Sequence, residues 1–298
     1  MEDEVVRAFA FIIPGLSRGL VYALIALGFV LIYKCTGIFN LALGEMMVFG
    51  GYLTYFFSVQ LGVPLWGGVI LAIIVAGGIG VITDRLFIRP LIGQPPFAMV
   101  MVTLALGSII VATIILCWGS DTLVVPRLFP AGGISIVGST IGWDYIGFGA
   151  VSLVLLIGLL AFFRYSRIGL SMMAISEDQQ AAQALGVSVK RIVQVAWVIG
   201  ITTAFIGGIM LTSLTSVQYG QASIGLIGIA VALLGGLQSM GGVIIGGLLV
   251  GLVQGLSAGY IDPHVPGSFQ EVSAYILMIL ILLFRPYGFF GWERIERV

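Results

Sequence analysis

The sequence predicts an all-α polytopic membrane protein in which residues 1–298 form a single transmembrane domain of about 8–9 helices. Two features of the composition predict this class: hydrophobic residues make up 59% of the chain and charged residues only 9%, whereas ordinary soluble domains carry about 25% charged residues. The third observation is the stretch 192–261, which contains no Asp, Glu, Lys, Arg or His. Because a membrane-spanning helix needs about 20 apolar residues, this stretch is long enough for several spans.

The spans are predicted to be helices because the apolar runs are long, whereas barrel strands alternate apolar and polar residues over about ten positions. In chain order the predicted spans are 10–33, 42–60, 64–83, 97–118, 145–163, 192–214, 222–238, 240–259 and 271–284. Segments 222–238 and 240–259 are short and meet at Gln238–Gly242. They form either two crossings or one broken, re-entrant pair, which leaves eight or nine spans.

The long connection 119–144 holds Asp121, Pro126, Arg127, Pro130, Gly132 and Gly133, so it is too polar and too broken to cross the membrane. We expect it to form either a small cap on the outer face or a plain connecting loop.

The distribution of Lys and Arg predicts the orientation, because these residues accumulate on the cytoplasmic side. With the N-terminus outside and the C-terminus in the cytoplasm, ten of the 13 basic residues fall inside: Lys34, Arg85, Arg89, Arg164, Arg167, Lys190, Arg191, Arg285, Arg294 and Arg297. Arg7 and Arg127 fall outside, and Arg18 lies within the first span. The opposite orientation would reverse this ratio.

One polar segment, 164–191, interrupts the apolar chain and would be its largest cytoplasmic surface. Its centre predicts a helix of about ten residues, with Ser176 as the N-cap of a capping box completed by Gln179. Glu177 and Asp178 would lie in the first turn, where the helix dipole favours negative charge. Ala181 and Ala182 favour helix and close approach of a partner, and Gly186 would end the helix. We interpret the segment as a docking element; the alternative is a solvated loop.

Several motifs carry a resemblance to a known family. The pattern Ala181-Ala182-x3-Gly186 resembles the cytoplasmic EAA-type loop of ABC importer permeases, and the wider run 167–187 is similar to that of branched-chain amino acid permeases in particular. Two further stretches resemble the same family, Gly19–Tyr33 leading to Asn40–Met46, and Leu283–Gly291. The resemblance covers almost the whole chain.

The resemblance implies an ABC importer permease subunit that translocates branched-chain amino acids or a related small polar solute. Its partners would be a second permease subunit, usually a related but different chain, two ABC ATPases bound to the cytoplasmic loops, and an extracytoplasmic substrate-binding protein. ATP and Mg would bind the ATPases, so this chain would hold no cofactor. It would be a multi-pass protein of a prokaryotic plasma (inner) membrane, in contact with the lipid bilayer and not with nucleic acid.

Two departures from the family pattern concern the substrate more than the class. Gln180 stands where the loop motif has Glu, and the glutamate of this loop lies earlier, at Glu177. Leu43 stands where the family more often has a polar residue such as His or Gln. Because the family also includes permeases for urea and short amides, the substrate stays open at this point.

Three polar residues are candidates for a permeation path or gate: Asn40, Glu45 and Arg18. An acid near the membrane usually has a partner or a role, so Glu45 belongs either to the path or to the helix start that Asn40 would cap. Arg18 lies about two turns into the first span. It either snorkels outward or attracts a carboxylate or a buried acid.

Glycines recur at four-residue spacing in the segment 242–259, and such spacing gives a smooth face for close helix contact. They are Gly242, Gly246, Gly247, Gly251, Gly255 and Gly259. Packing within the chain is the simpler interpretation, and a pathway or a dimer seam is the alternative.

Missing motifs bear on the function. The chain has no GxxxxGK[ST] or HExxH motif, so we expect no ATP hydrolysis and no enzymatic role. One histidine and two cysteines are too few for a disulfide framework or a metal cluster, so we expect no metal site. The rival hypotheses are an ion-coupled secondary transporter, which would need intramembrane acids or histidines as relays, and a membrane assembly factor.

Overall fold

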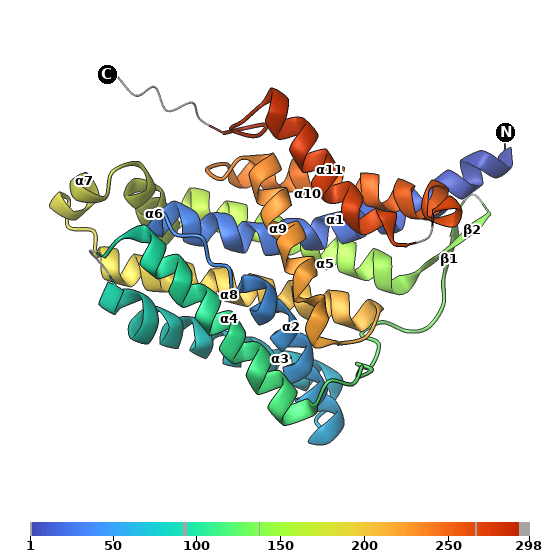
Figure 1. The fold of residues 1–298 in the computed structure, drawn as a ribbon, viewed down its shortest axis with the longest axis horizontal. Coiled ribbons are helices and arrows are strands. Elements are labelled where there is room, and N and C mark those ends of the chain that lie inside the picture. Colours follow the sequence, from blue (N-terminus) through green and yellow to red (C-terminus); the bar gives the residue numbers. More distant parts are fainter. Residues whose placement is uncertain (1, 92–93, 137, 266, 292–298) are drawn as a thin grey trace. The chain divides into compact units, whose positions relative to one another are not determined.

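A computed structural model describes residues 2–91, 94–136, 138–265 and 267–291 of the chain (Figure 1). The described residues form eleven α-helices, and a helix occupies each predicted span. They are α1 (Glu2–Thr36), α2 (Leu43–Tyr55), α3 (Leu65–Ile82), α4 (Pro96–Trp118), α5 (Trp143–Tyr165), α6 (Arg167–Glu177), α7 (Gln179–Ala184), α8 (Val189–Leu214), α9 (Ala222–Gly235), α10 (Met240–Tyr260) and α11 (Phe269–Phe284). The predicted helical membrane fold is confirmed.

Six helical stretches in the described residues are long and apolar enough to cross a membrane: those that contain α1, α3, α4, α5, α8 and α10. The stretch 219–235, which contains α9, and α11 are apolar but shorter. α2 is extended by a π-helix, Phe56–Gln60, and α3 by a π-helix, Thr83–Ile88, and a 3₁₀ turn, Arg89–Leu91. The total of eight or nine spans therefore stays a prediction. Two residues used to predict the orientation, Arg294 and Arg297, lie outside the described residues.

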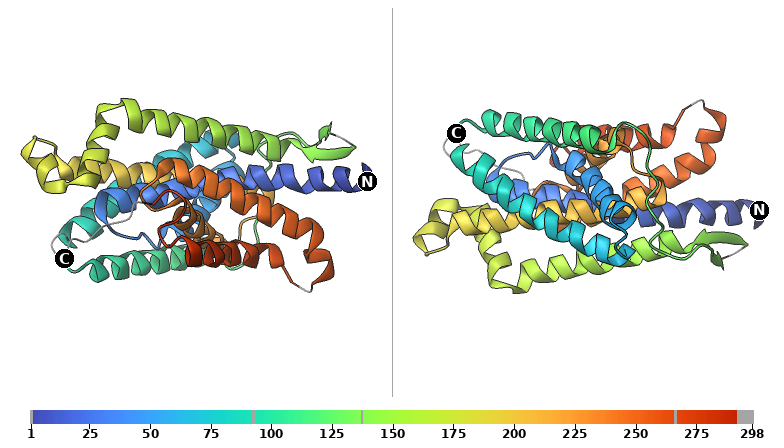
Figure 2. Two further views of the ribbon diagram at one scale, coloured as in Figure 1. Left: turned by 90° about the horizontal axis from the view of Figure 1, so that it is seen from above. Right: turned by 90° about the horizontal axis from the view of Figure 1, so that it is seen from below.

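The connection 119–144 contains a small structured element rather than a plain loop. Strands β1 (Gly133–Ile136) and β2 (Ser139–Gly142) pair antiparallel, with Ile134 opposite Ile141. Figure 2 shows this hairpin beside the N-terminal end of α1, where the Ser139 hydroxyl donates a hydrogen bond of 2.9 Å to the Val6 carbonyl. The chain is thus all-α apart from this hairpin and one isolated bridge between Leu123 and Val217 in the described part.

The chain divides into two compact units. Unit 1 comprises residues 1–26, 129–156 and 227–298, and unit 2 comprises residues 27–128 and 157–226. In unit 2, α8 packs against α2 and α3. Glycines allow the close approach, because a Cβ on Gly51 of α2 would lie 2.6 Å from the Thr212 hydroxyl of α8. The largest side chains buried there include Trp197, Tyr52 and Phe205.

In unit 1, the glycines of α10 meet the glycines of α1. A Cβ on Gly15 would lie 2.5 Å from the Gly251 carbonyl oxygen, and one on Gly255 would lie 3.0 Å from the Gly15 Cα. The two backbones therefore touch directly, as small residues permit in membrane helices. Gly247 also faces α1, at Gly19 and Ala23, and Gly259 faces it at Phe11.

Gly242 and Gly246 face a different helix. A Cβ on Gly246 would lie 2.8 Å from the Val231 carbonyl oxygen of α9, and Gly242 contacts the Gly235 carbonyl. The glycine series of α10 thus serves contacts with α9 and α1 within the chain.

Candidate functional site

The polar segment 164–191 folds as two short helices, and this corrects the predicted single helix that begins at Ser176. Ser176 lies in the last turn of α6, where its hydroxyl donates to the Met173 carbonyl at 2.7 Å. Asp178 has an extended backbone (φ −150°) and caps α7, because its carboxylate accepts hydrogen bonds from the Gln180 and Ala181 amides at 2.8 and 3.0 Å. Asp is as good an N-cap as Ser, so sequence pattern did not distinguish the two. Glu177 is the last residue of α6, not part of the first turn of α7.

Gly186 ends α7 at the position expected from the sequence. Its φ is +86°, in the left-handed region that favours glycine. The Gly186 amide donates to the Gln183 carbonyl at 2.9 Å and the Val187 amide to the Ala182 carbonyl at 3.0 Å. This pair of hydrogen bonds is a Schellman motif, which satisfies the last carbonyls of a helix.

The two alanines of the docking motif have different environments. Ala182 is 2% exposed and therefore cannot contact a partner, which corrects the expectation that both alanines present a docking surface. Ala181 is exposed, and so is Leu185, at 85%. Leu185 is the C-cap residue of α7, so an exposed apolar side chain stands at the end of this helix.

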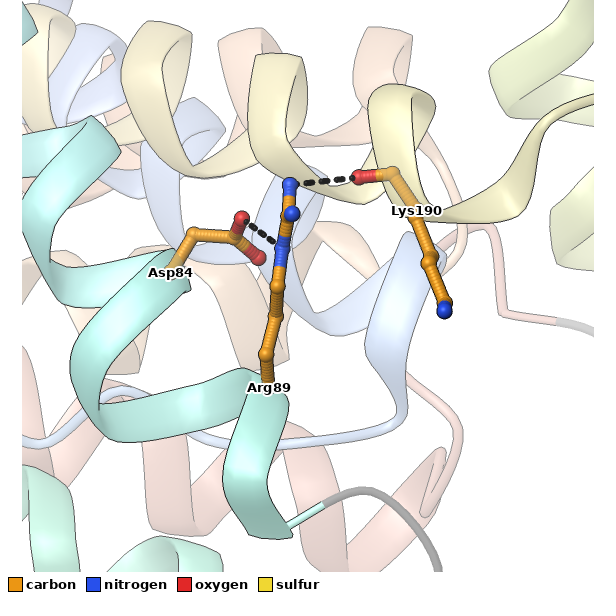
Figure 3. A network of polar contacts seen from close by, with 3 residues as sticks. All are labelled: Asp84, Arg89 and Lys190. Atoms are coloured by element: carbon orange, nitrogen blue, oxygen red, sulfur yellow. Dashed lines mark hydrogen bonds and ion pairs between the residues drawn. The ribbon is translucent and has the colours of Figure 1, made fainter.

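A polar network that the sequence analysis did not identify lies next to this segment (Figure 3). The Arg89 Nε donates to the Asp84 carboxylate at 2.7 Å, and an Arg89 terminal nitrogen donates to the Lys190 carbonyl at 3.3 Å. The Asp84 side chain is fully buried and that of Arg89 is 29% exposed. The network ties the end of α3 to the first turn of α8, which follows α7 by four residues. The available signal was a lone acid in an apolar run, Asp84.

Asn40 lies just before α2, and Glu45 lies in its first turn. Asn40 is 1% exposed and accepts a hydrogen bond of 3.1 Å from the Ala42 amide. The N-cap of α2 is Ala42, without a side-chain bond, so the prediction of Asn40 as N-cap is wrong by two residues. It closes a local turn before the helix.

The Glu45 carboxylate faces α4. Its Cδ lies 3.2 Å from the place that a Cβ of Gly107 would occupy, so glycine at 107 leaves the room for it. The Glu45 Oε2 is buried and has no hydrogen-bond partner among the described residues. Its place in the first helical turn suits the helix dipole, and a role in the permeation path stays a prediction.

Arg18 lines a cavity of about 350 Å³ within unit 1. A terminal nitrogen of its guanidinium donates to the Tyr145 hydroxyl at 3.2 Å, and the Arg18 Cζ lies 5.6 Å from the centre of the Tyr145 ring. The cavity also has Gln254 of α10 and Gln270 of α11 in its wall. Sequence reasoning found Arg18 but had no signal for Tyr145, which is 127 positions away.

Metal binding has no support in the described residues, which contain no group of three or more His, Cys, Asp or Glu side chains placed to hold an ion. Of the two cysteines, Cys35 is buried and Cys117 is exposed.

Comparison with known proteins identifies relatives that match the chain from end to end. The family described as branched-chain amino acid transport system / permease component matches residues 11–283. The high-affinity branched-chain amino acid transport system permease protein LivH of Salmonella typhimurium is 30% identical over 300 residues, which cover 95% of this chain and 96% of LivH. The corresponding BraD protein of Pseudomonas aeruginosa is 29% identical over 313 residues and 99% of each chain.

The fold also has a counterpart among solved structures. The structure of PsaBC from Streptococcus pneumoniae in complex with Fab matches with a TM-score of 0.50 and 15% identity, over 89% of this chain and 88% of that one. At this identity the match supports the fold alone.

Proposed function

We propose a transport cycle for this chain on the premise that it belongs to the family of permease components of branched-chain amino acid transport systems. It is an integral-membrane permease subunit of an ABC importer and a multi-pass protein of the inner membrane. The rival hypothesis of an ion-coupled secondary transporter has no support from any relative. The observation that carries the proposal is the match with LivH and BraD over almost the full length of all three chains.

The substrates that we propose are the branched-chain L-amino acids leucine, isoleucine and valine. LivH and BraD are named as high-affinity permeases for this class. The departure at Leu43, which left urea and amides open, is one position, whereas the similarity extends over the whole chain.

The partners that we propose are a second, related permease subunit, two ABC ATPases and an extracytoplasmic substrate-binding protein. ATP and Mg would bind the ATPases, and this chain would hydrolyse nothing itself. The ATPases would dock on α7, which is capped at both ends by Asp178 and Gly186 and presents the exposed Leu185. A helix held at both ends transmits a displacement rather than fraying.

A displacement of α7 would reach the spans through the first turn of α8. The Arg89 guanidinium bonds to the backbone there at Lys190 and to the buried Asp84 of the α3 segment, so α8 and α3 would move together. Such movement between two states of the permease, biased by ATP-driven closure of the ATPases, would alternate access to the substrate path. The orientation with the N-terminus outside and α7 in the cytoplasm rests on the Lys and Arg distribution.

Reconstitution tests the proposed function directly. The chain would be purified with its copurifying subunits, identified by mass spectrometry, and placed in proteoliposomes with the binding protein outside. We expect uptake of radiolabelled L-leucine that requires ATP inside and the binding protein outside. Uptake driven by an ion gradient without ATP, or recovery of the chain without ATPases from membranes that contain them, would contradict the proposal.

A further inference from the structure

The cavity around Arg18 has the dimensions and the lining of a small-molecule site. Its volume of about 350 Å³ lies within the range of about 300–1,000 Å³ that ligand pockets occupy. Four separate parts of unit 1 form its wall: α1 around Pro14 and Arg18, the junction of β2 and α5 around Tyr145, α10 around Gln254, and the start of α11 at Gln270. Such a convergence of distant segments on a few polar groups is typical of a binding site.

The Arg18 guanidinium is the only basic side chain in the cavity wall, and among the described residues it makes no ion pair with an acid. Its one hydrogen bond goes to the neutral hydroxyl of Tyr145. A guanidinium has five N–H donors in a planar fork that matches a carboxylate. Because a cation within a membrane span is costly unless it is paired, the unused donors favour an anionic ligand.

A second polar group supports this interpretation. Gln254 is 6% exposed, and no hydrogen bond joins its amide to another described residue. Buried amides are normally hydrogen-bonded, so a nearly buried glutamine in a cavity wall has donors and acceptors available for a ligand. Its backbone lies close to α1, since the next residue, Gly255, packs on the α1 backbone at Gly15.

Another part of the wall suits an aliphatic group. Ala10, Phe11, Pro14 and Ala258 contribute apolar surface beside the guanidinium and the amide. A ligand with a carboxylate at one end and an aliphatic side chain at the other would match both parts of the cavity.

We propose that this cavity is a binding site for the transported amino acid within the permease, in which Arg18 pairs with the α-carboxylate and Gln254 bonds to the polar end of the ligand. Tyr145 is a positioning residue that holds the guanidinium over the cavity. This assignment rests on the proposed function for the class of substrate, and it adds the place on this chain where the substrate would bind.

The test is equilibrium binding of radiolabelled L-leucine to the complete permease–ATPase complex in nanodiscs, without the binding protein. Unlabelled L-leucine and L-leucinamide, which lacks the carboxylate, serve as competitors. For the wild-type complex we expect leucinamide to compete at least about tenfold more weakly than leucine, the loss expected for a hydrogen bond between charged groups. The Arg18→Gln complex should bind leucine at least about tenfold more weakly than the wild type does. Leucine and leucinamide should compete equally well for this variant. Arg18→Lys should fall between, because it keeps the charge and loses the fork.

Two controls separate binding from folding. Arg127→Gln removes the same charge from an exposed position outside the cavity and should bind like the wild type. Tyr145→Phe keeps the ring and removes the hydroxyl, so it should weaken leucine binding less than Arg18→Gln does. Each variant must retain the gel-filtration profile of the wild-type complex and its ATPase subunits; Arg18→Lys provides the test if Arg18→Gln does not assemble.

Three results would overturn the assignment: unchanged leucine binding in Arg18→Gln, an equal loss for leucine and leucinamide, or no leucine binding to the wild type up to its solubility limit. If Arg18→Gln binds leucine normally but loses affinity for the binding protein, the cavity holds a carboxylate of that protein instead. This result would also overturn the assignment. ATP-driven leucine uptake by the wild type tests the proposed function separately, so the two can fail independently.

Discussion

Substitution of Gly251 by alanine tests the close contact of α10 with α1, and the structure sets the size of the effect. A Cβ on Gly251 would lie 2.5 Å from the Gly19 Cα and 2.7 Å from the Gly19 nitrogen. Carbon atoms in contact are separated by about 3.5–4.0 Å, so the two backbones would have to separate by about 1 Å. Neither contact is a flexible side chain that could turn away. Overpacking of this kind costs about 1–3 kcal/mol.

The matched control is Gly241→Ala in the first turn of the same helix, where a Cβ would meet nothing within 4 Å. Alanine there should be neutral or stabilise the helix by up to about 1 kcal/mol. The measurement is the midpoint of thermal unfolding of the purified complex in detergent. We expect Gly251→Ala to unfold several degrees below wild type and Gly241→Ala at or above it. A Gly251→Ala midpoint equal to that of Gly241→Ala would refute the argument.

The other predictions concern the docking helix and the network beside it. Leu185→Glu should leave membrane insertion and the unfolding temperature unchanged, since the side chain is 85% exposed. The same variant should reduce copurification of the ATPases and ATP-driven leucine uptake. Unchanged uptake would exclude α7 as the docking element. Gly186→Ala should cost about 1 kcal/mol because φ is +86°, and Gly186→Asn should cost less since asparagine tolerates this conformation; equal losses in unfolding temperature would count against the strain. Arg89→Gln should lower the unfolding temperature clearly, because leaving a buried carboxylate unpaired costs about 3–5 kcal/mol. Adding Asp84→Asn to this variant should recover part of the loss. No recovery in the double variant would mean that Arg89 and Asp84 are not coupled.

Local rules explain what could be predicted within the docking segment and what could not. Gly186 was recognisable from the sequence because a helix stop depends on the backbone conformation of one residue. The start was misplaced because Ser176 and Asp178 both qualify as caps, and only the packing of α6 decides which of them is free to leave the helix. Likewise, Ala181 and Ala182 are identical in composition, and only the folded segment decides that Ala182 is buried.

The amino-acid sequence by itself determined that this chain is a helical membrane protein, where most of its spans lie, and to which family it belongs. These properties follow from the length of apolar runs and from motifs of neighbouring residues, which are local. The tertiary structure decided which polar residues meet: Arg89 with Lys190, and Arg18 with Tyr145, pairs separated by 101 and 127 positions. The packing of the helices brings these side chains together, and no pattern along a single segment encodes that.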